Sequence, residues 1–543
     1  MEEIFLFSKW FYRGEGNNTL VIYSPENRTV LRLPKSNVCR AKEETSLLYW
    51  RAKTLQSLQK GLKWANKFFP LIGAEYVQNG SIIELPDSFI KNITDLITSS
   101  NEERPKYRLM KEVSPYNKFA VLMPDFCFVR SYGTDISSPR DMTTPMSAAG
   151  NLLPTFCVEI KPKCATLPMF RGVGCKARIK TSICKFCLTQ WTKVNRDGKY
   201  LQRSGYCPMD LFSADIHRVW HALLCLLENP QNNLKIFKDG ISMYSGDLTS
   251  PSEYQQCITS GDNTLPFSIM TSQYKKLLIQ LEEDLNNTLI SGQVFGTNLD
   301  HSLEDGINLN STIFLLSTLL QLLIHDSNQN TTEDVSESDQ IPQICKGSRY
   351  LRSKNSKSIP EELVSKNLSF GNYGVFQRIL NVQKLDEIGS NEALLIFNNL
   401  CEKGHRDNVD FCLENARMHT SENDVNKSTN GMTLRFEKPP RLNQNARRLQ
   451  GEHQYHASEE KEMEALIKYL ISASSKDCSV MISFQEITQG NTNYKKCFKE
   501  VFSGKVFNYS IAVVDLDFKG SERIPKYYQE DEDIVDNYFH FNT

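Results

Sequence analysis

Short β-branched runs, each bounded by Gly, Asn or Pro, lie at both ends of this chain and constrain its fold more than any other feature. Near the amino end, residues 10–35 contain YRGEGNN, TLVIY and TVLRLPK, a pattern that predicts a small antiparallel sheet with a glycine loop. Further strands are predicted at 82–86, 118–123, 156–161, 478–484 and 507–518.

Helical patterns occupy much of the sequence between these runs. Helices are predicted within 41–69 and at 209–228, 267–284, 310–325 and 459–474, so the fold class is α+β. The most apolar run, 313–324, is interrupted by polar residues and has only 12 positions, too few to span a bilayer. It predicts a buried core helix, and no membrane association is expected.

Two polar stretches, 326–360 and 419–460, are poor in aliphatic residues and rich in Asn, Ser, Thr, Glu and Lys. Segments of this composition bury too little apolar surface to offset the entropy lost on ordering. We therefore predict two mobile insertions that contribute nothing to the core.

The charge balance excludes some functions. Lys plus Arg number 63 and Asp plus Glu 64, a net charge of −1, which argues against a protein that binds nucleic acid or a membrane surface by bulk charge. Any anionic ligand must be met by a local cluster. The 15 cysteines are spread along the chain, and its amino end has two acids and no basic stretch, so a reducing compartment, cytoplasm or nucleus, is expected.

The sequence VEIKPK at 158–163 is the sharpest candidate for a binding site. Alternation along a strand puts Glu159, Lys161 and Lys163 on one face. Residues 159–203 contain eleven basic and two acidic residues, an excess typical of a site for a polyanion. An edge strand kept soluble by its lysines is the alternative.

Two carboxylates lie at i and i+2 near the carboxyl end. Asp515 and Asp517 face the same way on a predicted strand, and two like charges so placed destabilise the strand unless a cation lies between them. This favours a divalent metal ion at the pair, and a strand face that is simply exposed to solvent is the alternative. Asp477 precedes another predicted strand and is a candidate base, with a simple turn residue as the alternative. Residues suited to phosphate oxygens follow the pair: Lys519, Arg523 and Tyr527.

Two elements near the amino end suit a nucleotide. Gly14, Glu15 and Gly16 precede a strand, where backbone amides can approach a phosphate without Cβ clashes; a plain tight turn is the alternative. Arg32 lies within an apolar strand, where an unpaired cation is costly, and an arginine there can hold phosphates.

The cysteines allow a metal site without requiring one. Cys184 and Cys187 form a CxxC motif, and other cysteines lie near it in sequence. These neighbours are Cys164, Cys175 and Cys207, and a second possible set is Cys401, His405, Cys412 and His419. One CxxC without a second at standard spacing favours ordinary thiols, and structural zinc is the alternative.

Several motifs occur in a fixed order along the chain. They are RGEG at 13–16, VLRL at 30–33, VEIKPKC at 158–164, YCPMDLFS at 206–213, PQNNLKIF at 230–237, KDCSVMIS at 476–483, and VVDLDFK with RIPKYY within 513–528. In this order they resemble the inositol-pentakisphosphate 2-kinase family, over roughly 10–325, 375–400 and 460–543.

The resemblance implies a two-lobed kinase-like fold, with a small N-lobe built on an antiparallel sheet and a larger mixed C-lobe that contains the inositide site. The implied parts are the N-lobe with its glycine loop at 1–125, the hinge and inositide-binding region at 126–325, an insertion at 326–360, C-lobe helices at 361–418, an insertion at 419–460, and catalytic and metal-binding strands at 461–543. A monomer is expected.

The implied reaction transfers a phosphoryl group from ATP, held between the lobes with Mg²⁺, to the 2-hydroxyl of inositol 1,3,4,5,6-pentakisphosphate, giving inositol hexakisphosphate and ADP. Such a transfer requires that the two substrates are positioned and that the negative charge of the phosphates is neutralised. Acidic residues that bind a metal ion, together with many cationic residues, would meet both requirements. A non-catalytic inositide-binding scaffold is the main alternative. A kinase that acts on another target is a second alternative. The sequence has no HRD tripeptide before DLD, which disfavours a protein kinase.

By position, the resemblance also assigns roles to single residues. Asp477 would be the base, and Asp515 would bind Mg²⁺ with support from Asp517. The nucleotide-binding residues would be Gly14, Glu15, Gly16, Asn17, Arg32, Asp125 in a hinge at 121–125, Glu159 at the ribose, and Lys161 as a catalytic contact to the phosphates. The inositide-binding residues would be Arg104 or Arg108, Lys163, Lys185, Lys193, Asn232 or Asn233, Lys519, Arg523 and Tyr527.

Overall fold

The computed structural model describes most of the chain. The described residues are 8–36, 44–78, 80–99, 104, 108–109, 111–113, 118–130, 153–168, 174–196, 200, 202–246, 279–287, 310–328, 343–350, 359–366, 368–371, 374–404, 406–420, 432–436, 457–487 and 496–542.

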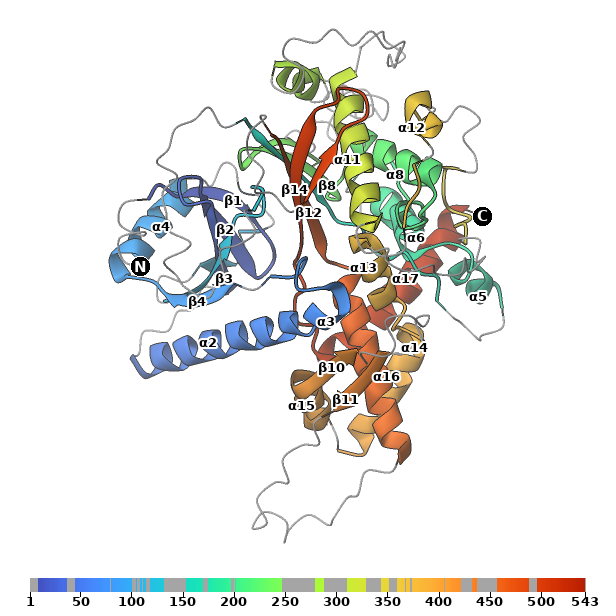
Figure 1. Cartoon of the computed structure of the whole chain (residues 1–543). Helices are drawn as coiled ribbons and strands as arrows, with labels where there is room; N and C mark the ends of the chain where they lie inside the picture. The colour runs from blue at the N-terminus through green and yellow to red at the C-terminus, as the bar shows by residue number, and fades with distance from the viewer. Residues whose placement is uncertain are drawn as a thin grey trace, which may run out of the picture.

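The first sheet lies near the amino end and is antiparallel throughout (Figure 1). Leu20, Ile22 and Leu31 alternate along its strands and pack against Phe89 and Ile93 of the adjoining helix, which gives this sheet its own core. The strands predicted within 10–35 and near 82–86 and 118–123 are confirmed. The sheet runs β1 (Phe11–Glu15), β2 (Thr19–Ser24), β3 (Thr29–Ser36), β6 (Phe119–Pro124), β4 (Ser81–Glu84), with β5 (Glu112–Val113) on β3, and the helix is α4 (Asp87–Ser99).

A long helix, α2 (Glu44–Asn66), runs beside this sheet toward the centre of the molecule and is followed by the short α3 (Phe69–Ile72) (Figure 1). Trp64 of α2 is buried, and its indole N–H donates to the hydroxyl of Ser474 at 3.1 Å. The helical prediction for 41–69 is confirmed, and the end of α2 is anchored outside the first sheet.

The second sheet joins strands from distant parts of the sequence. Val480 lies opposite Ile160, because a strand from the carboxyl end is inserted between an earlier strand and a later one. Every pairing in this sheet is antiparallel. Its order is β13 (Cys497–Lys499), β14 (Val506–Val514), β12 (Ser479–Glu486), β7 (Thr155–Ile160), β8 (Leu234–Lys238), β9 (Ile241–Ser245).

Two predicted strand ends are wrong. The predicted strands 156–161 and 507–518 include Lys161 and Asp515, whereas β7 ends at Ile160 and β14 at Val514. Asp515 has φ of 61°, and Lys163 has φ of 64°, both in the left-handed region that interrupts an extended run. These charged residues therefore lie in segments that have just left the sheet.

Helices gather on one side of the second sheet (Figure 1). The most buried is α11, whose leucines are almost completely covered, as the prediction of a core helix at 310–325 required. Of the predicted helix 267–284, residues 267–278 lie outside the described residues, and 279–287 are helical. The helices are α5 (Cys175–Lys180), α6 (Lys185–Trp191), the π-helix η3 (Thr192–Arg196), α7 (Pro208–Leu211), α8 (Ile216–Glu228), α11 (Asn310–Asn328), α12 (Glu361–Ser365), α13 (Val375–Gln383), α14 (Gly389–Glu402), α15 (Arg406–Asn415), α16 (Ala457–Ser475), the 3₁₀ turn η5 (Ser521–Arg523) and α17 (Ile524–Asn542).

None of the described helices is both long enough and apolar enough to cross a membrane.

The first polar insertion does contribute to the core, contrary to the prediction. Asp326 at its start is buried in α11, and Cys345 and Ser348 are buried further along. The hydroxyl of Ser348 donates to the buried carboxylate of Asp210. The average composition of a polar segment therefore does not reveal the few residues in it that are buried in the core.

In the second polar insertion, the structure describes two strands and the start of α16. The strands β10 (Ala416–Thr420) and β11 (Met432–Phe436) pair as an antiparallel hairpin. The remainder, 421–431 and 437–456, lies outside the described residues.

The two sheets define two lobes: we call residues 8–125 the N-lobe and the later residues the C-lobe. The backbone N–H of Val513 in β14 donates to the carbonyl of Tyr76 at 2.8 Å. Val121 and Met123 of β6 belong to one apolar cluster with Met481 of β12. The lobes are therefore joined both by backbone and by apolar side chains.

Candidate functional site

Three neighbouring strand ends carry the charged residues. Because β12 is antiparallel to both β7 and β14, its start lies beside their ends, and Ser479 is opposite Val514. Asp477 precedes β12, Lys161 follows β7 and Asp515 follows β14. The sheet thus brings together residues that the sequence placed in three separate motifs.

Asp515 is held by donors from three segments. Arg32 Nη1 lies 3.0 Å from Oδ1, the hydroxyl of Ser479 donates to Oδ2 at 3.1 Å, and Lys161 Nζ is 3.6 Å from Oδ2. Burial raises the pKa of Asp515, but Arg32 and Lys161 outweigh burial and hold this pKa below its ordinary value. The carboxylate is therefore ionised at neutral pH and fixed in place.

Lys161 lies between two carboxylates, with its Nζ also 3.9 Å from Glu159 Oε1. Burial lowers the pKa of Lys161, but Asp515 and Glu159 outweigh burial and raise it above the ordinary value. This side chain is a permanent cation, as a contact to phosphate oxygens requires.

Asp477 lies between two other lysines. Lys163 Nζ donates to Oδ1 at 2.9 Å, and Lys519 Nζ is 3.4 Å from Oδ2. Burial raises the pKa of Asp477, but Lys163 and Lys519 outweigh burial and lower it. The side chain is still 57% exposed, so a carboxylate flanked by two cations remains open to a ligand.

The backbone around Lys163 is anchored by side chains that the sequence analysis missed. The amide of Gln383 donates to the carbonyl of Lys163 at 2.9 Å and accepts from the N–H of Ala165 at 2.8 Å. The hydroxyl of Tyr206 donates to the carbonyl of Pro162 at 2.8 Å. Gln383 lies 220 residues after Lys163, and no local pattern relates the two.

Arg32 on β3 reaches from the N-lobe to both aspartates that follow β14. Its guanidinium is 3.0 Å from Asp515 and 3.7 Å from Asp517. The cation that joins the two carboxylates in the structure is Arg32, and the divalent metal predicted there stays a prediction. The side chain of Asp517 is 67% exposed, so the pair also offers hard oxygen ligands suited to Mg²⁺.

The glycine loop connects β1 to β2. Gly14 lies in β1 beside a bulge, and the N–H of Gly16 donates to the carbonyl of Thr19 at 2.7 Å. Arg108 donates to the side chain of Asn17 at the tip of this turn. The half-exposed Arg108 is thus placed at the edge of the loop.

Glu15 and Arg104 brace this loop from inside the N-lobe. The Glu15 carboxylate pairs with Lys35 and with Arg104 Nε, the latter at 2.7 Å, and all three side chains are almost fully buried. Burial raises the pKa of Glu15, but Arg104 and Lys35 outweigh burial and lower it. The side chain of Glu15 therefore points into the lobe, and of the two predicted arginines Arg108 is the more accessible.

Asp125 is buried directly after β6. Its carboxylate pairs with Arg13 at 2.7 Å and accepts from the N–H of Cys127 at 3.0 Å. The Arg13 guanidinium also lies 5.5 Å from the ring centroid of Phe237 in the C-lobe. Arg13, absent from the predicted residues, thus links β1 to the segment after β6 and to the second lobe.

The two asparagines of the PQNN motif lie beside Lys161. The amide of Asn233 donates to the carbonyl of Lys161 at 2.8 Å. The side-chain oxygens of Asn232 and Asn233 are buried and have no hydrogen-bond partner among the described residues. Buried acceptors of this kind are costly unless a ligand or water satisfies them.

The basic excess in 159–203 is smaller in the folded chain than in the sequence, because acids of α17 neutralise part of it. Lys185 Nζ lies 3.4 Å from Asp531, while Lys193 Nζ lies 3.3 Å from Gln231 Oε1. The other pairs are Lys176 with Glu532 and Asp536, Lys180 with Asp531 and Glu532, and Arg196 with Asp533. The basic excess seen in the sequence therefore overstates the positive charge that these residues offer to a ligand.

Arg523 and Tyr527 lie on η5 and the first turns of α17. Burial raises the pKa of Tyr527, and Arg523 offsets only part of that rise, so the phenol stays protonated at neutral pH. A protonated phenol beside a guanidinium offers two kinds of donor to a phosphate.

The cysteines of the CxxC motif belong to a larger group. The sulfur atoms of Cys184, Cys187, Cys207 and Cys345 all lie within 4.8 Å of one another, an arrangement that can hold a metal ion. In the second predicted set, His405 lies outside the described residues.

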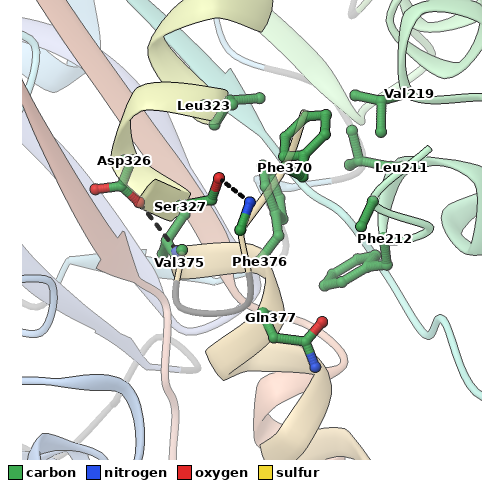
Figure 2. A pocket seen from close by; sticks show the side chains of 13 residues that line it. Leu211, Phe212, Val219, Leu323, Asp326, Ser327, Phe370, Val375, Phe376 and Gln377 are labelled. Atoms are coloured by element: carbon green, nitrogen blue, oxygen red, sulfur yellow. Dashed lines mark hydrogen bonds between the residues drawn. The ribbon is translucent and has the colours of Figure 1, made fainter. Parts of the chain in front are cut away.

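Figure 2 shows a pocket elsewhere in the C-lobe, between α7, α11 and the start of α13. Asp326 accepts from the N–H of Val375 at its rim at 3.1 Å. The lining is mostly apolar and includes no lysine or arginine among the described residues: Leu211, Phe212, Val219, Leu323, Phe370 and Phe376. This pocket therefore does not suit a polyanion.

Comparison with known proteins gives one consistent family. The family model described as "Inositol-pentakisphosphate 2-kinase" matches residues 12–533. A zebrafish (Danio rerio) protein named inositol-pentakisphosphate 2-kinase is 26% identical, covering 97% of this chain and 92% of the relative. An Arabidopsis thaliana protein of the same name is 24% identical, covering 98% of this chain and 93% of the relative.

Proposed function

This chain belongs to the inositol-pentakisphosphate 2-kinase family, and from that premise we propose that it transfers the γ-phosphoryl group of ATP to the 2-hydroxyl of inositol 1,3,4,5,6-pentakisphosphate. The products are inositol hexakisphosphate and ADP. The observation that carries this proposal is the charged group at the ends of β7, β12 and β14, where Asp477 and Asp515 each lie among cations from separate segments.

ATP would lie between the lobes. Its adenine would border the apolar cluster of Val121, Met123 and Met481 next to the hinge at Asp125. Its ribose would lie on the side of Glu159, and its phosphates would contact Lys161 and the backbone of the loop from Gly14 to Asn17. Arg32 is close enough to Asp515 to change partners when the phosphates arrive.

Asp515 and Asp517 would hold Mg²⁺. Both carboxylates converge on one cation already, and Asp517 is open to solvent, so the oxygen donors fit a hard divalent ion. When bound, the ion would neutralise charge on the phosphate oxygens of ATP.

The inositide would lie beside Asp477. Lys163 and Lys519 both contact this carboxylate, so they would bind phosphates on either side of the hydroxyl that reacts. The side chains of Asn232 and Asn233 would contribute amide N–H donors to phosphate oxygens of the inositide. Further contacts would come from Lys185, Lys193, Arg523, Tyr527 and, from the N-lobe, Arg108.

The chemistry then follows from position and charge. Asp477 accepts the proton of the 2-hydroxyl, and the resulting oxygen attacks the γ-phosphorus of ATP while the bond to the β-phosphate oxygen breaks. Lys161 and Arg32 stabilise the charge that spreads over the transferred group. Because Asp477 has a lowered pKa, it is ionised and ready to act as a base at neutral pH.

An assay with separate pentakisphosphate isomers tests this function. The purified chain with ATP and Mg²⁺ should form hexakisphosphate from the 1,3,4,5,6 isomer, the one isomer whose 2-hydroxyl is free. Calorimetric titration with that isomer, run alongside, distinguishes the alternative. Tight binding without product at any Mg²⁺ concentration would make the protein an inositide-binding scaffold, and product from another isomer would change the target hydroxyl.

A further inference from the structure

The segment that follows β7 is held in place by side chains from other parts of the C-lobe. Three consecutive carbonyls of this segment each accept a hydrogen bond from a different side chain. The pairs are Asn233 to the carbonyl of Lys161 at 2.8 Å, Tyr206 to the carbonyl of Pro162 at 2.8 Å, and Gln383 to the carbonyl of Lys163 at 2.9 Å. Buried carbonyls need such partners once the chain has left a sheet, so tertiary contacts determine the path of this segment.

Gln383 binds the backbone on both sides of Cys164. Its side-chain amide donates to the carbonyl of Lys163 at 2.9 Å and accepts from the N–H of Ala165 at 2.8 Å. Gln383 is fully buried, so water does not compete for either hydrogen bond. Lys163 has φ of 64°, a left-handed conformation that a lysine keeps only where surrounding contacts hold it. The two hydrogen bonds of Gln383 lie directly at that strained residue.

Gln383 is in turn tied to the helix that leads to Asp477. It is the last residue of α13, and its own carbonyl accepts from the buried hydroxyl of Ser472 in α16 at 2.8 Å. Shortly after Ser472 the chain reaches Asp477, whose carboxylate accepts from Lys163 Nζ at 2.9 Å. The backbone and the side chain of Lys163 are therefore both linked to the segment that carries Asp477, and these contacts form a closed ring.

Lys161 lies two positions before Lys163 and is held by a different residue. Its N–H donates to the carbonyl of Asn233 at 2.9 Å, and its carbonyl accepts from the side chain of the same residue. Lys161 Nζ pairs with Asp515 at 3.6 Å, whereas Lys163 Nζ pairs with Asp477. The two lysines thus have separate supports and separate carboxylate partners.

We propose that Gln383 is a positioning residue for the inositide, because it holds Lys163 in the left-handed conformation that places the ammonium group beside Asp477. This inference rests on the proposed function, in which Lys163 binds a phosphate next to the hydroxyl that reacts. Without Gln383, the backbone of Lys163 would relax to an ordinary conformation and its Nζ would leave Asp477. The inositide would lose one phosphate contact, while Lys161 and the nucleotide would be unaffected.

Matched variants of two glutamines on α13 test the proposal. Gln383→Met removes both hydrogen bonds and keeps the length of the side chain, and the control, Gln377→Met, removes a hydrogen bond to Asn381 on the same helix. In Gln383→Met the Kd for the pentakisphosphate, measured by calorimetric titration, and its KM should rise on the order of tenfold, with the KM for ATP unchanged. Unchanged inositide affinity, an equal rise in both KM values, or the same rise in Gln377→Met would overturn the proposal.

A double-mutant cycle separates the positioning of Lys163 from a general loss of stability. In a chain that already carries Lys163→Ala, adding Gln383→Met should weaken inositide binding little further, because the residue through which Gln383 acts is gone. If the two changes were fully additive, Gln383 would support the fold without positioning Lys163, and the proposal would be wrong.

Hydrogen exchange of the wild-type chain tests the same contact without a substitution. The N–H of Ala165 should exchange slowly in the absence of substrates, because Gln383 already accepts from it. Rapid exchange at Ala165 would contradict the proposal even if no variant of Gln383 folds.

The wild-type controls distinguish this inference from the proposed function. A wild-type chain that binds no pentakisphosphate would overturn both together. A chain that binds the pentakisphosphate but forms no hexakisphosphate would overturn the proposed catalysis alone, and the calorimetric comparison would still decide the role of Gln383.

Discussion

At the scale of single residues, Asp477 and Asp515 differ in what surrounds them. Asp515 is fixed by Arg32, Ser479 and Lys161, whereas Asp477 is largely exposed and, among the described residues, pairs with the side chains of Lys163 and Lys519. A fixed carboxylate suits a metal ligand, and an exposed one suits a base that must meet a hydroxyl group.

Replacing Asp477 by alanine should remove turnover but keep both substrates bound. A positioned base contributes roughly 10²–10⁴ in rate, so turnover should fall by at least that factor. The change also frees Lys163 and Lys519 for the ligand, so affinity for the pentakisphosphate should stay equal or rise. Steady-state kinetics with calorimetric titration checks both, and weakened binding together with a lower melting temperature would show that Asp477 only supports the turn before β12.

Lys163→Ala should act mainly on the inositide. Loss of one charge-assisted contact costs about 1.5–3 kcal/mol, which raises the KM for the pentakisphosphate roughly 10- to 150-fold. Lys526→Ala is a suitable control, because that lysine is 72% exposed and pairs with a neighbour on its own helix, Glu530. A larger effect of Lys163→Ala on the KM for ATP would contradict its assignment to the inositide.

A site residue can be predicted from the sequence when the residues next to it in the chain form a recognisable pattern. Lys161 and Asp515 were found because charges next to a β-branched run are conspicuous. Gln383 and Arg13 were missed, since their partners lie far away in sequence and an isolated Gln or Arg has no distinctive pattern. Glu15 was predicted to face the nucleotide, because the sequence does not show that Lys35 and Arg104 meet it inside the lobe.

At the scale of elements, most strands and helices were predictable, but their ends and roles were less so. The N-lobe hairpins and α11 follow from local apolar periodicity. The extended runs before Asp515 and Lys163 end in left-handed backbone, which residue type alone does not reveal at Asp or Lys. The pairing of the acids of α17 with the basic residues of α5 and α6 has no local signal in the sequence, because it is a tertiary contact.

The first polar insertion should be separable into a dispensable part and an essential part. Deleting 330–341 should leave turnover and the melting temperature nearly unchanged, because a segment of this polar composition is unsuited to a core and the closure entropy of a loop depends only weakly on its length. Deleting 330–355 also removes Cys345 and Ser348, both buried, and should lower the melting temperature and the turnover. Calorimetric melting curves and the hexakisphosphate assay compare the two, and equal behaviour of the two deletions would show that 343–350 does not support the fold.

At the scale of the whole molecule, electrostatics should set its tolerance of acid. In the folded chain burial raises the pKa of Asp477, Asp515 and Asp531, but neighbouring cations outweigh burial and leave all three below their ordinary values. A depressed folded-state pKa contributes stability that is fully present above the unfolded pKa, about 3.9 for Asp, and is lost as pH falls through the folded pKa.

The free energy of unfolding should therefore be nearly level from neutral pH to about pH 5 and fall below about pH 4. Urea denaturation at a series of pH values measures it. Asp531→Asn should flatten part of the fall, because Asp531 is ion-paired with Lys180 and Lys185, while Asp533→Asn, at a weaker and more exposed pair, should not. Identical acid profiles for all three proteins would show that these pairs do not set the acid limit.

The second sheet also determines when during its synthesis the chain can become active. All strands of the first sheet lie within the first 124 residues, so the N-lobe can close early. β7 must wait for β12, and at about 5–20 residues per second the ribosome needs on the order of 15–60 s to make the chain between them. Throughout that interval the apolar strand at 155–160 lacks its partner on that edge, and such an unpaired edge is prone to aggregation. No partly translated chain can assemble the three strand ends where the charged residues meet.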